Sequence, residues 1–325
     1  MTSRSSDLSV DLTASGRFDW WQALVQVLSS IEAVRDGRAM YVLLAAFCGA
    51  GLASASAVAS FGRGEMNWAI GQGAAALFIA FYGVNAAGLM SMDRALGRPV
   101  REVGQAVQDA LGVGHRVLLS LLTMLLVAAL VAAALLGLVW LCGLPRVGTW
   151  LFVLVVPVTV IVVGLLMLAG YAVVAPLTGP TVWAGASTLE AIRALARLIR
   201  GRLLHAAVLV GGLSLATGVT GAATSLMVLL GGRVMAEVSV RVLGVDIPPQ
   251  ILMAGLVGRG VQITDASALP PHALGYISAA TVGGGVVFAI ALVLPTLVYL
   301  RGVCEVYLAL RQYGQLAAQQ RSVAA

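Results

Sequence analysis

The sequence has few charged residues and no lysine. Charged residues occupy 10% of the 325 positions, whereas 60% are hydrophobic. A soluble domain has about a quarter charged residues, so this composition excludes an ordinary soluble protein and predicts an integral membrane protein. All 20 cationic residues are arginine, which excludes a phosphate-binding loop that depends on a lysine.

Residues that ligate metals or act as nucleophiles are also scarce. The chain has three cysteines and three histidines, without the spacing of a metal site. Of the histidines, His115 and His205 would ligate haem only if they faced each other at one depth, and positions at the membrane interface are favoured for both. The interiors of the apolar runs have no Asp, Glu or Arg for proton or metal chemistry within a bilayer. We therefore expect no catalytic residue, no metal site and no cofactor.

Long apolar runs dominate the rest of the chain. Each is long enough to cross a hydrocarbon core of about 30 Å as a helix. The runs are residues 39–61, 68–92, 117–142, 150–175, 203–230 and 273–300. They predict an all-α polytopic membrane protein with six transmembrane helices.

The arginines are distributed unevenly between the two sides of these runs. Fifteen of the 20 lie in the N-terminal segment, the second and fourth loops and the C-terminal tail. Because short cytoplasmic segments carry an excess of arginine, we expect both termini in the cytoplasm and the protein in the bacterial inner membrane. The polar residues 1–16 are expected to be a disordered cytoplasmic tail.

An amphipathic segment, residues 187–202, precedes the fifth run. Ser187 and Glu190 have the spacing of a capping box, which predicts the start of a helix. The apolar residues that follow recur at helical spacing, with four arginines between and after them: Arg193, Arg197, Arg200 and Arg202. Such a helix is expected to lie on the cytoplasmic surface, with its arginines among lipid phosphates.

Two further segments, residues 18–35 and 99–112, are predicted to be similar surface helices. Trp20 and Trp21 in the first are expected to anchor it at the interface, and Pro99 suits the first turn of the second. This gives three units of a surface helix and two spans, which could be copies of one repeat. Alternatively, any six-span protein with both termini inside would place arginines at these points. The expected divisions are 17–92, 93–175 and 176–300, with a periplasmic loop at 231–272 and a cytoplasmic tail helix at 301–325.

Polar side chains inside the spans are the remaining candidates for a functional site. Asn85 is the strongest, because an amide needs a partner in hydrocarbon; a hydrogen bond between helices is the favoured interpretation. Thr217, Thr220 and Thr224 lie along the fifth span beside glycines. They could line a narrow polar seam, although such residues more often permit tight packing.

Residues 176–212 resemble a known bacterial pattern: a proline at the end of a span, a surface helix with Glu, Ala and Arg, and a basic-Gly step into the next span. The matching residues are Pro176, Glu190, Ala191, Arg193, Arg200 and Gly201. The pattern is similar to that of uncharacterised six-span proteins related to the membrane domain of glycerophosphodiester phosphodiesterases. The resemblance implies a six-helix membrane module. The catalytic phosphodiesterase domain has no counterpart here, so no activity is implied.

These observations favour a non-catalytic scaffold, assembly factor or accessory subunit of a membrane complex. Its expected partners are the lipid bilayer and either another membrane protein or a second copy of the chain. The alternative is a permease or channel-like carrier of a small neutral or lipidic substrate, with kinks at Pro157 and Pro295 as mobile parts. Nucleic acid is not expected as a partner, because the arginines are spread beside the spans.

Overall fold

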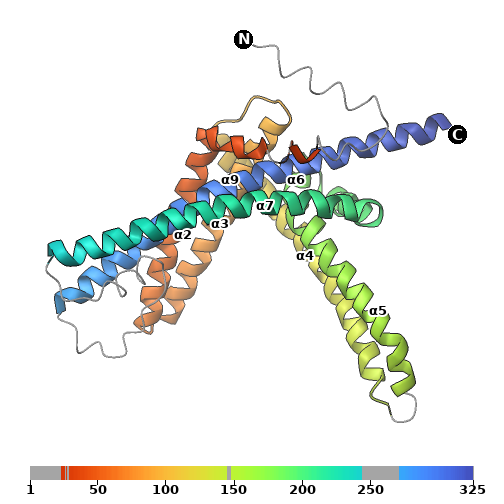
Figure 1. The fold of residues 1–325 in the computed structure, drawn as a ribbon, viewed down its shortest axis with the longest axis horizontal. Helices are drawn as coiled ribbons and strands as arrows, with labels where there is room; N and C mark the ends of the chain where they lie inside the picture. Colours follow the sequence, from red (N-terminus) through yellow and green to blue (C-terminus); the bar gives the residue numbers. More distant parts are fainter. Residues whose placement is uncertain (1–22, 26, 28, 145–147, 244–270, 325) are drawn as a thin grey trace. The chain divides into compact units, whose positions relative to one another are not determined.

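The computed structural model describes residues 23–25, 27, 29–144, 148–243 and 271–324, and the regular elements in these ranges are helices (Figure 1). The elements are η3 (Ser29–Arg35), α2 (Gly37–Gly62), α3 (Met66–Ala95), α4 (Val103–Leu141), α5 (Gly148–Ala169), the π-helical turn η4 (Gly170–Val174), α6 (Ala175–Trp183), α7 (Thr188–Leu243) and α9 (Pro271–Ala324). Six helical segments are long and apolar enough to cross a membrane. The all-α, six-span prediction is therefore confirmed.

Two of the sequence predictions fall outside the described residues. These are the disordered tail at residues 1–16 and the interface anchors Trp20 and Trp21. The three-fold repeat and the cytoplasmic location of both termini stay predictions.

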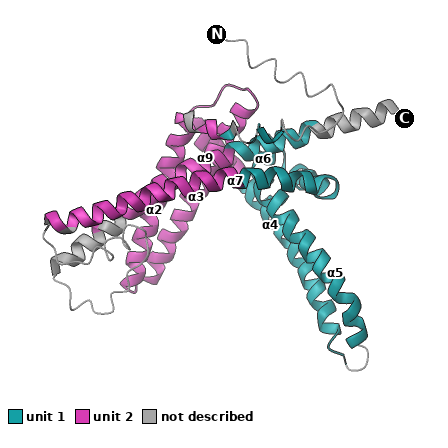
Figure 2. Cartoon of the chain, viewed as in Figure 1, with its two compact units in different colours: residues 1–30, 115–214, 301–325 teal, residues 31–114, 215–300 magenta. Residues whose placement is uncertain are grey.

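The chain divides into two compact units (Figure 2). Unit 1 comprises residues 1–30, 115–214 and 301–325, and unit 2 comprises residues 31–114 and 215–300. Helices α4, α7 and α9 each contribute residues to both units. The chain passes from one unit to the other inside each of these three helices, so each unit is made of separate stretches of sequence.

In unit 2, the α2–α3 hairpin packs closely through small residues. Gly64, with φ of +79°, forms the turn between the two helices. A Cβ atom at Gly83 of α3 would overlap the Cβ of Ala46 on α2, so only glycine permits this approach. A Cβ at Gly51 would lie 3.6 Å from the carbonyl oxygen of Gly285 on α9. Small residues therefore set the helix spacing in unit 2.

In unit 1, residues 301–310 of α9 form part of the core. Val303, Cys304 and Val306 are almost fully buried, and Gly302 lies directly against the side chain of Leu213 on α7. The sequence predicts a tail helix at residues 301–325, separate from the sixth span. The structure instead has one helix from Pro271 to Ala324, and the first part of the expected tail is among its best-buried residues.

Several other predicted boundaries are wrong, because the helices continue where a break was expected. The second predicted surface helix and the third span form one helix, α4, which begins at Val103 rather than at Pro99. Helix α7 likewise runs to Leu243, so the loop expected at 231–272 starts as helix. In the same helix, non-helical dihedrals at Arg202 (φ −146°, ψ 22°) mark a kink between the predicted surface helix and the fifth span.

Two prolines that follow the predicted fourth span, Pro176 and Pro180, do not end the helix. The π turn η4 precedes Pro176, which occupies the first turn of α6, where a missing N–H is tolerated. Helix α6 then continues through Pro180 to Trp183. The helical path therefore extends from Gly148 to Trp183 with a local π irregularity instead of a stop.

Candidate functional site

The first part of α7 carries the predicted arginines. Its capping box is confirmed: the N–H of Ser187 donates to Oε2 of Glu190 at 2.9 Å, and the N–H of Glu190 donates to Oγ of Ser187 at 3.4 Å. Arg193, Arg197 and Arg200 are exposed and share one helical face by their i, i+4, i+7 spacing. Ala191 and Leu195 on the other side are fully buried. In this segment the exposed arginines and the buried Ala191 and Leu195 therefore lie on different sides of the helix.

Arg202 differs from the other three arginines. Its side chain is half-buried at the kink of α7, and its Nη1 donates to the backbone carbonyl oxygen of Leu310 on α9 at 2.6 Å. A hydrogen bond from a charged group to a carbonyl contributes about 1.5–3 kcal/mol. The structure therefore separates Arg202, which joins two helices of unit 1, from the exposed face of Arg193, Arg197 and Arg200.

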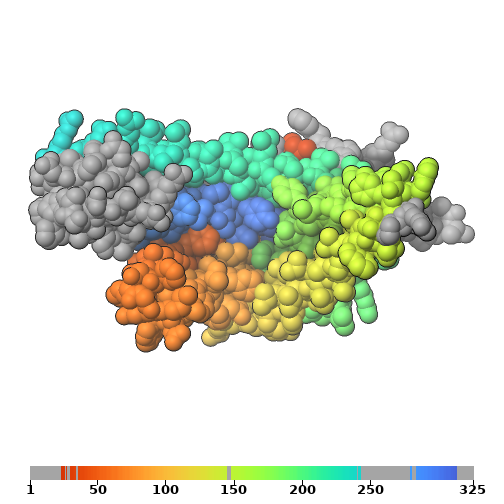
Figure 3. Space-filling view, turned by 90° about the horizontal axis from the view of Figure 1, so that it is seen from below, coloured from red at the N-terminus to blue at the C-terminus, as the bar shows by residue number. Residues whose placement is uncertain are grey.

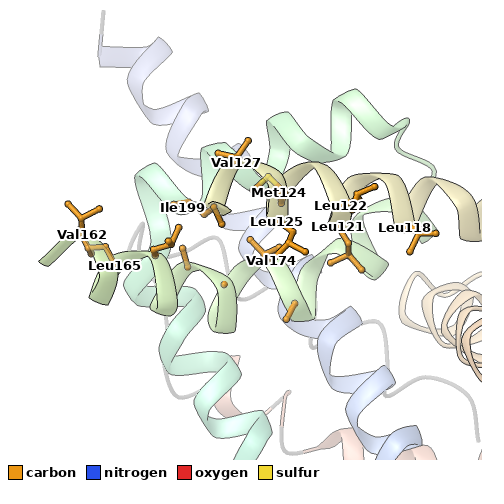
Figure 4. Close-up of a pocket in the computed structure, with 15 residues that line it drawn as sticks. Leu118, Leu121, Leu122, Met124, Leu125, Val127, Val162, Leu165, Val174 and Ile199 are labelled. Atoms are coloured by element: carbon orange, nitrogen blue, oxygen red, sulfur yellow. The ribbon is translucent and has the colours of Figure 1, made fainter. Parts of the chain in front are cut away.

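An apolar pocket with a volume of about 630 Å³ lies beside this segment in unit 1 (Figure 4). Its walls come from α4, α5, η4, the first residue of α6 and α7. The fifteen lining residues are Leu118, Leu121, Leu122, Met124, Leu125, Val127, Ala128, Val162, Leu165, Leu166, Ala169, Gly170, Val174, Ala175 and Ile199. None of them has a polar side chain, so the pocket fits hydrocarbon and offers no group for acid–base chemistry.

The π turn shapes one wall of this pocket. Gly170 and Val174, its first and last residues, both line the pocket. Between them, Tyr171 points its hydroxyl at Oγ of Ser214 on α7, 2.8 Å away. Single π turns inside α-helices are frequent at functional sites. Sequence reasoning missed the π turn, and the only available signal was the pair of prolines that follow it.

The predicted intramembrane polar residues do not line the pocket. Nδ2 of Asn85 donates to the carbonyl oxygen of Phe81, one turn earlier in the same helix, at 2.9 Å. The hydroxyls of Thr220 and Thr224 also bond to carbonyls of their own helix, whereas the buried hydroxyl of Thr217 has no hydrogen-bond partner in the described chain. These contacts do not join Thr217, Thr220 and Thr224 into a polar seam.

One ion pair lies in the buried part of α9. Nε of Arg301 is 2.6 Å from Oε1 of Glu305, whose side chain is 6% exposed, and the sixth candidate span runs over Gly283–Gln312. Both residues lie beyond the predicted sixth span, 273–300, whose interior has no Asp, Glu or Arg, so this pair does not contradict that expectation. A signal was available: the i, i+4 spacing of Arg301 and Glu305 allows them to neutralise each other on a helix.

The end of α3 in unit 2 carries a second group of ion pairs. Nη1 of Arg94 is 2.8 Å from Oδ2 of Asp36, which is buried. Arg101 contacts both oxygens of the buried Asp93, at 2.6 and 2.8 Å, and also contacts the exposed Asp109 at 2.9 Å. The hydrogen bond to Asp93 raises the pKa of Arg101 above its ordinary value, so the guanidinium stays charged at neutral pH. These contacts connect the residue before α2, the end of α3 and the start of α4.

Comparisons with protein-family models, with curated proteins and with solved structures found no match. The resemblance to the six-span proteins related to the phosphodiesterase membrane domain stays a prediction. Among the described residues, no three His, Cys, Asp or Glu side chains gather in the manner of a metal site. The apolar pocket and the exposed arginines of α7 are therefore the features from which a function can be argued.

Proposed function

We propose that this protein is a non-catalytic scaffold or accessory subunit of a bacterial inner-membrane complex, with the α4–α5 hairpin as its contact for another membrane protein. The observation that carries the proposal is how little of this hairpin is covered by its own chain. In the apolar windows of the spans that contain α4 and α5, 0% and 6% of the residues are buried, against 39% for α3. Nearly the whole circumference of the hairpin is left for other molecules to cover, and its side chains form open surface in Figure 3.

A stripe of small residues on α4 indicates that a helix of another protein, and not lipid alone, covers the hairpin. Ala129, Ala133 and Gly137 have i, i+4, i+8 spacing and are all exposed. Stripes of this kind allow two helix backbones to approach closely, and the resulting van der Waals contact drives association in membranes. A Cβ added at Gly137 would have no atom of this chain within 4 Å, so its space is free for a partner.

The far end of the hairpin supports its role as a spanning element. Trp140 at the end of α4 and Trp150 at the start of α5 are 78% and 79% exposed. Tryptophan is enriched where spanning helices meet the membrane–water interface. A hairpin with both tryptophans at its tip and an apolar surface behind them fits a complete crossing of the bilayer.

The test replaces Gly137 by leucine in the full-length protein. The Cβ of a leucine there would meet no atom of the described chain within 4 Å, whereas the side chain would prevent close approach of a second helix. Native mass spectrometry of protein extracted from its own membranes in mild detergent should show the wild type with a bound protein. The variant should lose at least about 90% of that complex, equivalent to about 1.4 kcal/mol.

The matched control is Gly164→Leu on α5, which is exposed and has no atom within 4 Å of its added Cβ but belongs to no such stripe. We expect it to keep the complex. A wild-type protein that is always monomeric and carries no other protein would contradict the proposal.

The pocket gives a second candidate function, a carrier of a lipidic substrate. Its lining consists of apolar side chains and glycine, as the hydrocarbon part of a lipid requires. A small neutral polar solute is disfavoured, because no lining side chain would replace its hydrogen bonds with water.

A further inference from the structure

We propose that the exposed arginines in the first part of α7 form a docking surface for an acidic segment of another protein. The surface consists of Arg193, Arg197 and Arg200, which we call the arginine face. The proposal does not rest on the contact assigned to the α4–α5 hairpin, because the two surfaces have no residue in common. It assigns one partner chemistry, a polypeptide with several carboxylates.

The three arginines lie on one side of one helix. Their i, i+4, i+7 spacing gives them a common face, which extends over about 10 Å at 1.5 Å per residue. Nε of Arg197 donates to the backbone carbonyl oxygen of Arg193 at 3.3 Å, so the side chain of Arg197 lies along the helix toward Arg193. The arginine face is therefore a row of guanidinium groups on a regular helix.

The charge of the arginine face is not balanced within unit 1. Unit 1 has 11 arginines and 5 acidic residues, whereas unit 2 has nine of each, so the whole net charge of +6 belongs to unit 1. In the described part of the chain, no arginine of this face forms an ion pair. Glu190, the nearest acidic residue along the helix, accepts the hydrogen bond from the N–H of Ser187. The face is left for a partner that brings negative charge.

Unit 2 shows which groups neutralise arginine in this chain. Arg94 pairs with the carboxylate of Asp36, and Arg101 contacts both oxygens of Asp93. Guanidinium and carboxylate groups match in geometry and form strong charge-assisted hydrogen bonds, and clusters of arginine recur in proteins that bind acidic motifs. Because unit 2 is neutral as a whole, a second copy of this chain offers no surplus of carboxylates there. The partner is therefore a different protein.

The opposite side of the helix favours a protein partner over a lipid surface. Ala191 and Leu195 are fully buried, and the other large apolar residues of this side are half-buried: Ile192, Leu198 and Ile199. A helix that lies in a membrane interface inserts an exposed apolar face among the acyl chains. Beyond Leu189 in the first turn, the exposed residues up to Gly201 are one glutamate, three arginines and that glycine. The apolar side is used by the protein itself, and the exposed side is polar.

The experiment measures, by fluorescence anisotropy, how a fluorescent oligoglutamate peptide binds the full-length protein in nanodiscs of phosphatidylcholine. This lipid has no net charge, so it neither attracts the arginines strongly nor repels the peptide. We expect oligoglutamate to bind the wild type and oligoglutamine not to bind. Because salt screens exposed charges, a higher ionic strength should weaken the binding of oligoglutamate.

The decisive variant replaces the whole arginine face: Arg193→Gln, Arg197→Gln, Arg200→Gln. Its Kd for oligoglutamate should rise at least about tenfold, equivalent to about 1.4 kcal/mol for three exposed charge pairs. If this variant does not fold, the single reversal Arg197→Glu in the middle of the face takes its place and should give the same loss.

The matched control removes three exposed arginines of unit 2: Arg38→Gln, Arg98→Gln, Arg241→Gln. Its net charge equals that of the arginine-face variant, and we expect its Kd to stay close to that of the wild type. Gly137→Leu on the α4–α5 hairpin should also bind oligoglutamate as the wild type does, which separates this surface from the hairpin contact.

Three results would overturn the proposal. The first is that oligoglutamate does not bind the wild type. The second is an equal loss of affinity in the two triple variants, which would mean that only net charge matters. The third is an unchanged affinity in the arginine-face variant. If that variant then retains less phosphatidylglycerol than the wild type in native mass spectrometry, the face binds lipid phosphates instead.

Discussion

The α2–α3 hairpin and the α4–α5 hairpin are both pairs of consecutive long apolar helices, but the rest of the chain buries them to different extents. The apolar windows of α2 and α3 are 22% and 39% buried, whereas those of the spans containing α4 and α5 are 0% and 6% buried. In unit 2 the first hairpin has close glycine contacts and buried ion pairs at one end. In unit 1 the second hairpin has an open apolar pocket along its inner side.

In these two hairpins the usual relation between hydrophobicity and burial is reversed. The more exposed hairpin is the more apolar: mean hydropathy is 2.7 and 3.0 for the spans containing α4 and α5, against 2.0 and 1.6 for α2 and α3. In a bilayer, residues that face lipid must be apolar, whereas residues packed against other helices can be small or polar. Hydropathy therefore reports which helices face the membrane and not which form the core.

The largest expected effect concerns the glycine contact of the first hairpin. Gly83→Leu would place four side-chain carbons where Ala46 already lies. Overpacking costs about 1–3 kcal/mol and occasionally more, and for this overlap we expect about 3 kcal/mol. We expect the free energy of unfolding, measured by SDS titration in mixed micelles, to fall by at least that amount, or the protein to fail to fold. Gly137→Leu on the second hairpin should be neutral in the same measurement, because its Cβ meets open space.

Equal destabilisation by these two leucines would contradict the comparison, because it would mean that the chain covers α4 as closely as it covers α3. The milder pair Gly83→Ala and Gly137→Ala gives the same contrast if Gly83→Leu yields no folded protein.

A smaller effect is expected from the ion pairs of the first hairpin. Asp93→Asn removes the charge that accepts two hydrogen bonds from Arg101. Breaking a buried pair costs about 3–5 kcal/mol, but the side chain of Arg101 is 24% exposed, so we expect about 2 kcal/mol. Asp109→Asn breaks the other contact of the same arginine, with an aspartate that is 53% exposed, and should cost less than about 1 kcal/mol. A larger loss from Asp109→Asn than from Asp93→Asn would contradict this assignment.

The sequence was sufficient for the helical class, the six spans and the start of α7. Hydropathy identifies spans because the bilayer imposes both length and composition, and the capping box of Ser187 and Glu190 is a local device that needs no tertiary information. The ends of helices were less predictable. A proline ends a helix only if the backbone hydrogen-bonding groups around it find no other partner. Before Pro176 the π turn is the local change that lets the helix continue.

Most of the candidate site could not be predicted, since it depends on contacts between distant segments. The pocket combines residues of α4, α5 and α7 that are up to 81 positions apart, from Leu118 to Ile199, and periodicity within one helix does not reveal such pairing. The hydrogen bond from Arg202 to Leu310 joins residues 108 positions apart. Arg202 follows the other arginines in sequence, but it lies at the kink of α7, which the spacing of the arginines does not reveal.

The smallest expected effect concerns the polar contact that connects the second hairpin to α7. The hydroxyls of Tyr171 in η4 and Ser214 in α7 are 2.8 Å apart. Hydrogen bonds between membrane helices average about 0.6 kcal/mol, so Tyr171→Phe should lower the free energy of unfolding by about that amount and raise hydrogen exchange at the end of α5. Ser214→Ala should give the same loss, and the double variant should add little to either. A strongly additive double variant, or a loss above about 2 kcal/mol, would show that Tyr171 makes a second contact and that this hairpin is held more firmly than its exposed surface indicates.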